Sequence, residues 1–164
     1  MLGRMIHKAF QVRKIVSGGQ TGVDRGALDA AITLGIEHGG WCPRGRRAED
    51  GVIPTRYEQR ETDSASYHVR TEQNVVDSDA TLIITRGALK GGTGLTVRMA
   101  AKHARPCHVV DLEGEFDIEA IRDWLRVQQA FRLNIAGPRE SSSRGIGQQA
   151  QLLLEKVFAP LKNH

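Results

Sequence analysis

The amino-acid sequence predicts a three-layer α/β domain, in which a mostly parallel, doubly wound sheet of about five or more strands carries helices on both faces. Short apolar segments alternate with helical segments along the whole chain. The apolar segments are continuous runs, which is typical of strands buried on both faces of a parallel sheet. Gly-rich turns follow several of these segments, where a strand would lead into a helix.

The length and composition fit one domain. The chain has 164 residues, of which 40% are hydrophobic and 26% charged, so it resembles neither a disordered chain nor a membrane protein. No stretch approaches the roughly 18 apolar residues of a membrane-spanning helix, and the N-terminus lacks the apolar core of a signal peptide. We therefore expect a single Rossmann-like domain over residues 1–164, with 1–11 as a loose N-terminal extension. Cys42 and Cys107 lack CxxC spacing and are interpreted as small buried thiols, which suits a reducing cytoplasm.

The first half of the chain begins with a strand, turn and helix. Residues 12–17 are rich in β-branched side chains and run into Gly18 and Gly19, which predicts a strand followed by a tight turn. Apolar residues at helical spacing then predict a helix over 24–34, ended by a glycine. Residues 36–42 are a weaker strand candidate, interrupted by Gly39 and Gly40. Residues 43–63 are charged and show no periodicity, so they predict a long loop, and loops of that length are usually functional or disordered.

A helix, a strand and a second helix follow in the centre of the chain. Residues 69–76 predict a helix, and 80–85 (ATLIIT) predict a strongly buried strand. Residues 87–94 form a second Gly-rich turn, and 96–104 predict the helix after it.

The last part of the chain repeats the alternation. Residues 106–112 predict a strand, and 117–129 predict an amphipathic helix with Asp117 as its N-cap. Residues 132–136 predict the last strand and 145–159 the closing helix.

The turn after the first strand is the first candidate binding site. In open parallel sheets, ligands bind at the carboxyl ends of the strands, near the point where the strand order reverses. Glycines there let backbone N–H groups face an anion, and a helix N-terminus adds partial positive charge. The turn matches neither GxGxxG nor GxxxxGK[ST], and a tight turn with a capped helix is the alternative interpretation. The candidate ligand-binding residues are Gly18, Gly19, Gln20, Thr21, Gly22 and Asp24.

A second Gly-rich turn follows the strand over 80–85 and precedes a helix, so the same physics applies. Two such turns at one edge of a sheet predict a shared pocket, whereas a mobile loop is the alternative. The candidates are Gly91, Gly92, Thr93, Gly94 and Thr96.

A third turn follows the last strand and contains Arg139, Glu140 and Ser141. Arg139 can form a bidentate pair with a phosphate or carboxylate, and the serine hydroxyl can donate to the same group. The alternative is that Arg139 pairs with Glu140 or another surface acid.

The charge pattern favours a small anionic ligand. The formal net charge is only +4, with 23 basic and 19 acidic residues. The arginines of residues 43–63 alternate with acids instead of forming the one-sided stripe that a nucleic acid needs. We add Arg44 from that segment and Asn74 from the helix over 69–76 to the candidate ligand-binding residues. The histidines at 38, 68, 103 and 108 lack the i, i+4 pairing of a helical zinc site, so no direct metal ligands are predicted, and His108 is expected in the core.

Several blocks in order resemble one known family. SGGQTGVDRGALDAA, GWCPRGRRAEDG, RTEQNVVDSDATLIIT, GGTGLT and NIAGPRES are similar to the putative molybdenum carrier family, over about residues 14–158. That family lies in the superfamily of Rossmann-like, nucleotide-ligand-binding domains that includes the lysine-decarboxylase-like (LOG) proteins. The resemblance implies a phosphate-bearing ligand, either molybdenum cofactor or a nucleotide, bound at the first two turns without direct protein–metal bonds. It also implies a homodimer or higher homo-oligomer.

The sequence departs from the nucleotide-cleaving relatives at their catalytic motif. Those relatives carry PGGxGTxxE, whereas this chain has Lys90, Leu95 and Arg98 in place of the Pro, the Thr and the catalytic Glu. Arg98 stays protonated and cannot act as a general base. We therefore expect a binding or carrier protein, with a nucleotide-modifying enzyme as the alternative and a nucleic-acid binder as a distant third. Such an enzyme would draw its acids from Asp24, Glu49, Asp50, Glu72 and Glu140.

Overall fold

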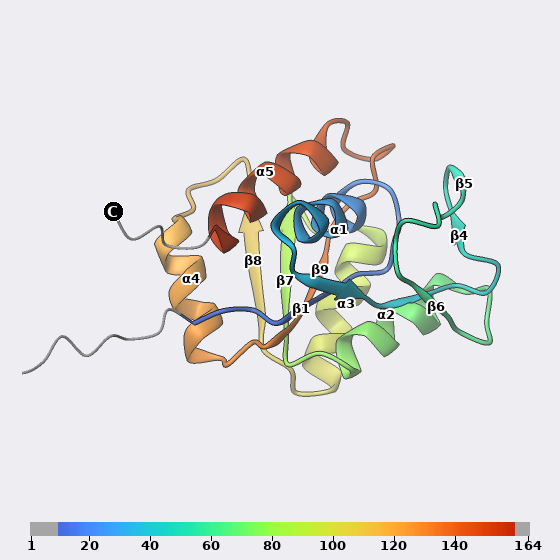
Figure 1. Cartoon of the computed structure of the whole chain (residues 1–164), viewed down its shortest axis with the longest axis horizontal. Helices are drawn as coiled ribbons and strands as arrows, with labels where there is room; N and C mark the ends of the chain where they lie inside the picture. The colour runs from blue at the N-terminus through green and yellow to red at the C-terminus, as the bar shows by residue number, and fades with distance from the viewer. Residues whose placement is uncertain (1–9, 160–164) are drawn as a thin grey trace, which may run out of the picture.

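The computed structural model describes residues 10–159 and contains a five-stranded parallel sheet in the order β2-β1-β9-β7-β8 (Figure 1). The N-terminal extension expected over 1–11 lies, except for its last two residues, outside the described residues. The sheet strands are β1 (Lys14–Val16), β2 (Glu37–Gly39), β7 (Ala80–Thr85), β8 (Cys107–Asp111) and β9 (Arg132–Ala136).

Helices cover both faces of the sheet. Helices α1 (Val23–Leu34) and α5 (Ile146–Phe158) pack side by side on one face, with α4 (Ile118–Val127) next to α5. Helices α2 (Tyr67–Val76) and α3 (Gly91–Lys102) pack together on the other face. The predicted three-layer, Rossmann-like α/β fold is confirmed. No helix within residues 10–159 is long and apolar enough to cross a membrane.

The strand order reverses in the middle of the sheet. The chain runs from β1 outward to β2, crosses to β7, runs outward to β8, and returns with β9 between β1 and β7. In register, Val16 pairs with Asn134 and Ile83 with Ala136, so β1, β9 and β7 end at the same edge. The crevice expected at a topological switch point therefore lies where these three strands end.

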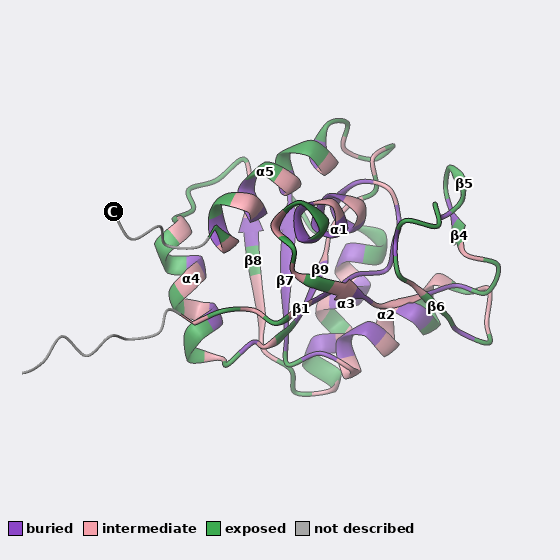
Figure 2. Ribbon diagram, in the orientation of Figure 1, coloured by how far each residue is buried: buried purple, intermediate pink, exposed green. Residues whose placement is uncertain are grey.

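Burial of the strands in the core explains their continuous apolar sequences. All six residues of β7 are buried, and the interior of β9 is buried as well (Figure 2). Leu82, Ile84, Leu133 and Ile135 belong to the main core cluster, which also contains the inner faces of α1, α4 and α5. Burial on both faces removes the polar–apolar alternation of a half-exposed strand.

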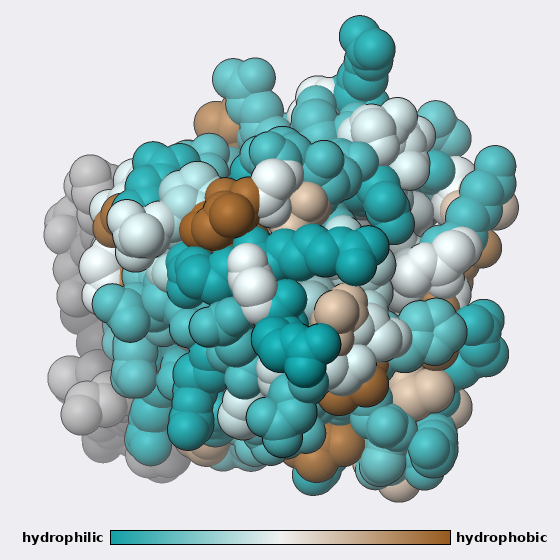
Figure 3. Space-filling model, turned by 90° about the vertical axis from the view of Figure 1, so that its right-hand side faces the viewer, coloured by the Kyte–Doolittle hydropathy of each residue, from teal (hydrophilic) through white to brown (hydrophobic). Residues whose placement is uncertain are grey.

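Residues 43–63 were expected to be a long loop, and this expectation was wrong in part. They contain three strands of two residues each: β4 (Arg47–Ala48), β5 (Gly51–Val52) and β6 (Arg60–Glu61). β4 pairs with β5, and β6 pairs with β3 (Trp41–Cys42). Such short pairs produce no periodicity in the sequence. A second apolar cluster, with Ile53 and Tyr57 packed against Leu28 of α1, anchors the segment. The face of the molecule that carries β4, β5 and β6 is mainly hydrophilic (Figure 3).

The interruption expected in residues 36–42 is confirmed, and one other element prediction needs correction. The segment forms two strands in different sheets, on either side of Gly40, which has φ +133° and whose Cβ would lie 2.1 Å from the carbonyl oxygen of Ser17. The helix expected from residue 96 begins at Gly91, so the second half of the Gly-rich turn over 87–94 lies in the first turn of α3. Packing of this helix outweighs the low helix propensity of its glycines.

The remaining predictions for single residues are mixed. Asp117 caps α4 as predicted, because its side chain accepts a hydrogen bond of 3.0 Å from the N–H of Glu119. Cys42 is buried, but Cys107 is only half-buried. His108 is also half-buried, because β8 is an edge strand, and its ring lies 5.2 Å from that of Trp124.

Candidate functional site

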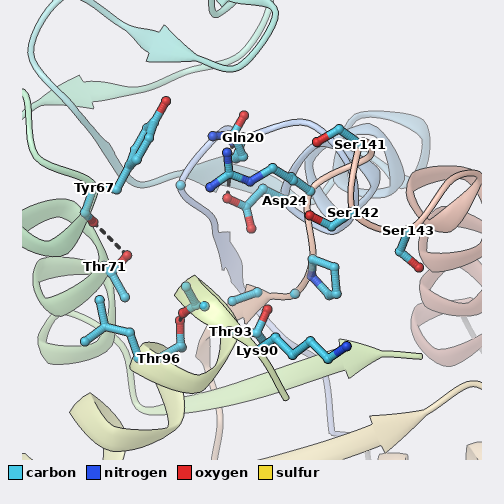
Figure 4. Close-up of a pocket in the computed structure, with 18 of the residues that line it drawn as sticks. Gln20, Asp24, Tyr67, Thr71, Lys90, Thr93, Thr96, Ser141, Ser142 and Ser143 are labelled. Carbon is cyan, nitrogen blue, oxygen red and sulfur yellow. Dashed lines mark hydrogen bonds between the residues drawn. The ribbon is translucent and has the colours of Figure 1, made fainter. Parts of the chain in front are cut away.

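A cavity of about 710 Å³ opens where β1, β9 and β7 end (Figure 4). Its walls come from the turn after β1, the inner side of α2, the start of α3 and the loop after β9. This is the edge of the sheet at which the sequence predicted a ligand site.

The predicted site residues divide into two groups. Gly18 of the first turn and Gly91 and Gly92 of the second line the same cavity. The other predicted residues that line it are Gln20, Asp24, Asn74, Thr93, Thr96, Arg139 and Ser141. Those that the structure places outside its lining are Gly19, Thr21, Gly22, Arg44, Gly94 and Glu140. The role of each in binding stays a prediction.

Gly19 and Gly22 allow neighbouring segments to approach the first turn. Both have φ near +80°, a region that favours glycine. A Cβ on Gly22 would lie 2.3 Å from the carbonyl oxygen of Pro138, and one on Gly19 would lie 2.9 Å from Cδ1 of Ile53. The N–H of Val23, the first residue of α1, donates to the same Pro138 oxygen over 3.2 Å. The chain itself therefore fills much of the space that the sequence assigned to a ligand there.

Three other predicted residues make contacts within the protein. The Thr21 hydroxyl donates to the carboxylate of Glu49 and accepts from the N–H of Glu140 over 3.1 Å. The Glu140 carboxylate accepts hydrogen bonds from the N–H groups of Gly145 and Gly147. It therefore caps the start of α5 and does not pair with Arg139. Arg44 is exposed and donates to the carbonyl oxygen of Asp63.

The N-terminus of α3 opens into the cavity. Lys90 is the N-cap residue, and it makes no side-chain cap hydrogen bond. Within residues 10–159, the N–H groups of Gly91 and Gly92 have no acceptor, and the first turn contains no acid. A Cβ added to either glycine would meet nothing within 4 Å. These amides carry the partial positive charge of a helix N-terminus and are open to an anion.

Asp24 is a buried carboxyl group in the cavity wall. Its Oδ2 accepts a hydrogen bond of 3.2 Å from the N–H of Gln20 and lies 3.9 Å from Nη1 of Arg70. Burial raises the pKa of Asp24 to about 6, although the positive charge of Arg70 acts in the opposite direction. The group can therefore change its charge near neutral pH. Figure 4 shows Gln20 and Asp24 together at one side of the cavity.

Arg70 is a cavity residue that sequence reasoning missed. It is buried, its Nη1 donates to the carbonyl oxygen of Gly18 over 2.7 Å, and its Nε donates to Thr71. A signal was present in the sequence. Tyr67, Arg70, Thr71 and Asn74 recur at the i, i+3, i+4, i+7 spacing that usually marks the apolar stripe of a helix. A polar stripe facing inward indicates a polar cavity.

The cavity lining is more basic than acidic. Its cations are Arg70, Arg86, Lys90 and Arg139, and its carboxylates are Asp24 and Glu113. The guanidinium of Arg86 is held by uncharged acceptors, which are the Gln149 side chain, the Ser143 hydroxyl and the carbonyl oxygen of Arg144. Its positive charge is therefore not neutralised through those contacts, and the cavity favours an anion.

The 43–63 segment is fixed against the rim of the cavity. The Glu49 carboxylate accepts from the Thr21 hydroxyl and from the N–H and hydroxyl of Ser141. Partial burial would raise the pKa of Glu49, but the hydrogen bonds from Ser141 and Thr21 outweigh it, so this pKa is lowered. Asp50 forms a bidentate pair with Arg25 of α1, and this pair lowers the pKa of Asp50.

The carboxylates expected for an enzyme are mostly elsewhere. Of Asp24, Glu49, Asp50, Glu72 and Glu140, only Asp24 lines the cavity. Glu72 pairs with Lys102 and with His103, whose Nε2 lies 2.8 Å away. Across residues 10–159, no group of three or more His, Cys, Asp or Glu side chains is placed to hold a metal ion.

Comparisons with known proteins agree with this architecture. The model of the circularly permutated YpsA SLOG family matches residues 15–158. The chain is also similar to the crystal structure of a "putative molybdenum carrier protein" from Syntrophus aciditrophicus SB. The sequence identity is 46%, the TM-score is 0.86, and the match covers 90% of this chain and 95% of that one. No curated protein matches the chain. The resemblance seen in the sequence blocks is thus confirmed, and the chain belongs to the circularly permutated YpsA SLOG family.

Proposed function

We propose that this protein binds or carries a small, phosphate-bearing, nucleotide-like ligand in the cavity. The observation that carries the proposal is the uncapped N-terminus of α3, whose Gly91 and Gly92 amides have no acceptor among the described residues and open into a basic cavity. A phosphate at that position accepts hydrogen bonds from the amides and interacts favourably with the helix dipole. Lys90 and Thr93 line the same part of the cavity and supply further donors (Figure 4).

The size of the cavity supports a ligand larger than a free phosphate ion. Its volume of about 710 Å³ falls in the range of roughly 300–1,000 Å³ that holds small organic ligands. The ring of Tyr67 and the apolar part of Leu95 lie in its wall. An aromatic side chain there offers a surface on which a planar heterocycle can stack.

Molybdenum cofactor is the finer proposal, because the similar protein from Syntrophus aciditrophicus is described as a molybdenum carrier. This cofactor would supply an organic phosphate and a metal held by its own sulfur atoms. The amides, guanidinium groups and hydroxyls of the cavity fit the phosphate and other oxygen atoms of such a molecule. We assign the phosphate to Gly91, Gly92 and Lys90, and Arg139 and Ser141 to the polar groups at the other wall.

An enzyme acting on a nucleotide derivative is the second candidate, and Asp24 is the observation that favours it. A buried carboxyl group with a pKa of about 6 can give or take a proton near neutral pH, as general acid–base catalysis requires. Release of free base from a panel of nucleoside monophosphates would support this candidate. Clear binding without turnover across the panel would exclude it.

The test of the main proposal is identification of the bound ligand. The protein is purified without added ligand and denatured, and the released small molecules are identified by mass spectrometry. In parallel, thermal unfolding is measured with GMP, AMP and molybdenum cofactor. We expect a phosphate-bearing heterocycle to be released, and a stabilisation of about 2.7 kcal/mol at a ligand concentration of 100 times Kd. Absence of any released heterocycle together with unchanged melting for all added ligands would contradict the proposal.

We further propose that the protein is cytoplasmic and forms a homodimer or a higher homo-oligomer. The support is the family resemblance for the oligomer and the two free thiols for a reducing compartment. Light scattering of the purified protein gives the oligomeric state directly. A monomer at all accessible concentrations would contradict the proposed oligomer.

A further inference from the structure

Tyr67, at the start of α2, is surrounded by three guanidinium groups. The Cζ atoms of Arg47, Arg70 and Arg139 lie 5.0, 5.2 and 5.9 Å from the centroid of its ring. The three arginines come from β4, from α2 and from the loop after β9, so the fold brings together cations that are distant in sequence. The ring face attracts each of them, but it does not remove their mutual repulsion.

Arg70 lines the cavity and has a donor, Nη2, that makes no hydrogen bond among residues 10–159. The residue is only 9% exposed, and its Nη1 and Nε donate to Gly18 and Thr71. Both hydrogen bonds of the Arg70 side chain thus use its other two nitrogens. Nη2 of Arg70 is accessible to solvent. Nε2 of Gln20, by contrast, is buried and makes no hydrogen bond among the described residues. A buried guanidinium group is costly unless its donors find acceptors, and the cavity is where an acceptor can enter.

The carboxylates near this cluster compensate only part of its charge. Asp24 is 3.9 Å from Arg70, which is too far for a hydrogen bond. Within the described part of the chain, neither Arg47 nor Arg139 has a carboxylate oxygen within the 4.0 Å of an ion pair. Glu49 offsets part of the Arg139 charge, because the two groups interact electrostatically, but no Glu49 oxygen lies within ion-pair distance of Arg139.

The cluster belongs to a different wall from the open amides of α3. Arg70 and Tyr67 come from α2, whereas Lys90, Gly91 and Gly92 belong to the start of α3. Both sets reach the same cavity. Figure 4 shows Tyr67 and Lys90 at separate sides of it, with Asp24 and Thr93 between them.

We propose that Arg70 and Arg139, with Arg47 at the rim, form a second oxyanion subsite beside Tyr67. The ligand therefore carries two anionic groups: a phosphate at the α3 amides and another oxyanionic group at the arginines. This inference rests on the proposed function of the same cavity and specifies the charge of its ligand. Bidentate pairing with guanidinium suits a second phosphate, a carboxylate or a metal oxyanion equally.

The test uses two probes, GMP and inorganic orthophosphate. GMP is added to saturation, and orthophosphate is then titrated while thermal unfolding of the full chain is followed. GMP offers one phosphate and fills one subsite, so orthophosphate should raise the melting temperature further by filling the other. If orthophosphate adds nothing beyond its effect on ionic strength, measured with sodium chloride, the second subsite does not exist.

The variants avoid the buried Arg70, whose replacement can disturb folding. Arg47 and Arg139 are both exposed, so the double variant Arg47→Gln, Arg139→Gln should fold. We expect its affinity for orthophosphate in the presence of GMP to fall at least about tenfold, because two charge-assisted partners are lost. Arg105→Gln removes an exposed charge at the opposite edge of the sheet, before β8, and should bind as the wild type does. Equal loss in the control and the double variant would overturn the proposal.

The responses to GMP and to orthophosphate separate the proposed function from the second subsite. No stabilisation by GMP at any concentration would remove the proposed nucleotide-binding function and the second subsite with it. Stabilisation by GMP without a further response to orthophosphate would remove the second subsite alone.

Discussion

Nη1 of Arg70 donates a hydrogen bond of 2.7 Å to the carbonyl oxygen of Gly18, which joins α2 to the turn after β1 across 52 residues of sequence. A Cβ on Gly18 would lie 2.4 Å from the same Nη1 atom. The glycine therefore lets a buried cation approach the backbone at the base of the cavity. The contact fixes both the turn and the direction of the guanidinium group.

Replacement of Gly18 by alanine should displace Arg70. The methyl group would overlap the guanidinium, so we expect a loss of about 1–3 kcal/mol in the free energy of unfolding, as for other overpacked sites. Binding of GMP should weaken as well, because Arg70 lines the cavity. Urea unfolding and thermal shifts with GMP measure the two effects.

Gly114→Ala is the matched control for that change. Gly114 is an exposed turn residue, and a Cβ there would meet its nearest atom at an ordinary 3.6 Å. Its stability should stay within about 0.5 kcal/mol of the wild type. If Gly18→Ala has the same urea midpoint as this control, the close approach of Arg70 does not constrain the turn.

The buried carboxyl of Asp24 should make stability depend on pH in an unusual direction. Its pKa rises from an ordinary 3.8 to about 6 on folding, so the native state holds a proton that the unfolded state releases. This contribution to stability is therefore present at low pH and is lost as the pH rises between about 4 and 6. A shift of this size corresponds to about 3 kcal/mol.

Asp24→Asn isolates this effect from other titrating groups. The lowered pKa values of Glu49 and Asp50 give the opposite dependence, and they are shared by both proteins. We expect the stability of the Asn variant relative to wild type to increase from pH 4 to pH 7 and then to level off. Urea unfolding at several pH values measures this difference, and a difference that stays constant with pH would contradict the burial of an ionisable Asp24.

Glu49 should hold the 43–63 segment against the loop after β9. Glu49→Ala removes the acceptors for the Thr21 hydroxyl and the Ser141 N–H. We expect amide hydrogen exchange at Ser141 to become about fivefold faster, which corresponds to about 1 kcal/mol for an exposed charged hydrogen bond. Glu58→Ala removes an exposed carboxylate from the same segment and should leave that exchange unchanged. Equal exchange at Ser141 in both variants would mean that Glu49 does not tether the segment.

The fold was predictable because burial left clear patterns in the sequence. The limits of β7 and β9 were predicted to the residue, since β7 is an apolar run between Asp79 and Arg86 and β9 is followed directly by Gly137 and Pro138. The start of α3 was not, because Gly91 and Gly92 have low helix propensity and begin a helix whose packed residues, such as Thr93 and Leu95, follow them. The short strands between residues 43 and 63 were missed for a related reason: strands of two residues have no period to detect.

The sequence predicted the edge of the sheet at which the candidate site lies, but not each residue that lines it. Glycine at a turn indicates close approach without indicating what approaches. At Gly22 the approaching group is the Pro138 backbone, and at Gly18 it is Arg70. Sequence reasoning treated both as positions for a ligand. Arg70 was overlooked because a single arginine within a helix usually faces solvent, and only its place in a polar stripe indicated otherwise.

The two glycines at the start of α3 allow the anion site to be tested without loss of folding. Gly92 has an ordinary backbone conformation, and a Cβ there would meet nothing within 4 Å. Gly92→Ala should therefore keep or raise stability, by up to about 1 kcal/mol, because alanine favours the helix. The methyl group would nevertheless occupy the space in front of the open amides. We expect GMP binding to weaken at least about tenfold, which corresponds to about 1.4 kcal/mol.

Gly94 and Gly91 supply the comparison that separates binding from folding. Gly94→Ala makes the same change in the same helix, but Gly94 does not line the cavity, so it should gain stability and bind GMP as the wild type does. Gly91 has φ +50°, so Gly91→Ala should lose about 1 kcal/mol of stability as well as affinity. Thermal unfolding of the three variants with and without GMP gives both quantities. If Gly92→Ala responds to GMP as fully as Gly94→Ala does, the ligand does not approach the N-terminus of α3, and the phosphate must bind at another wall.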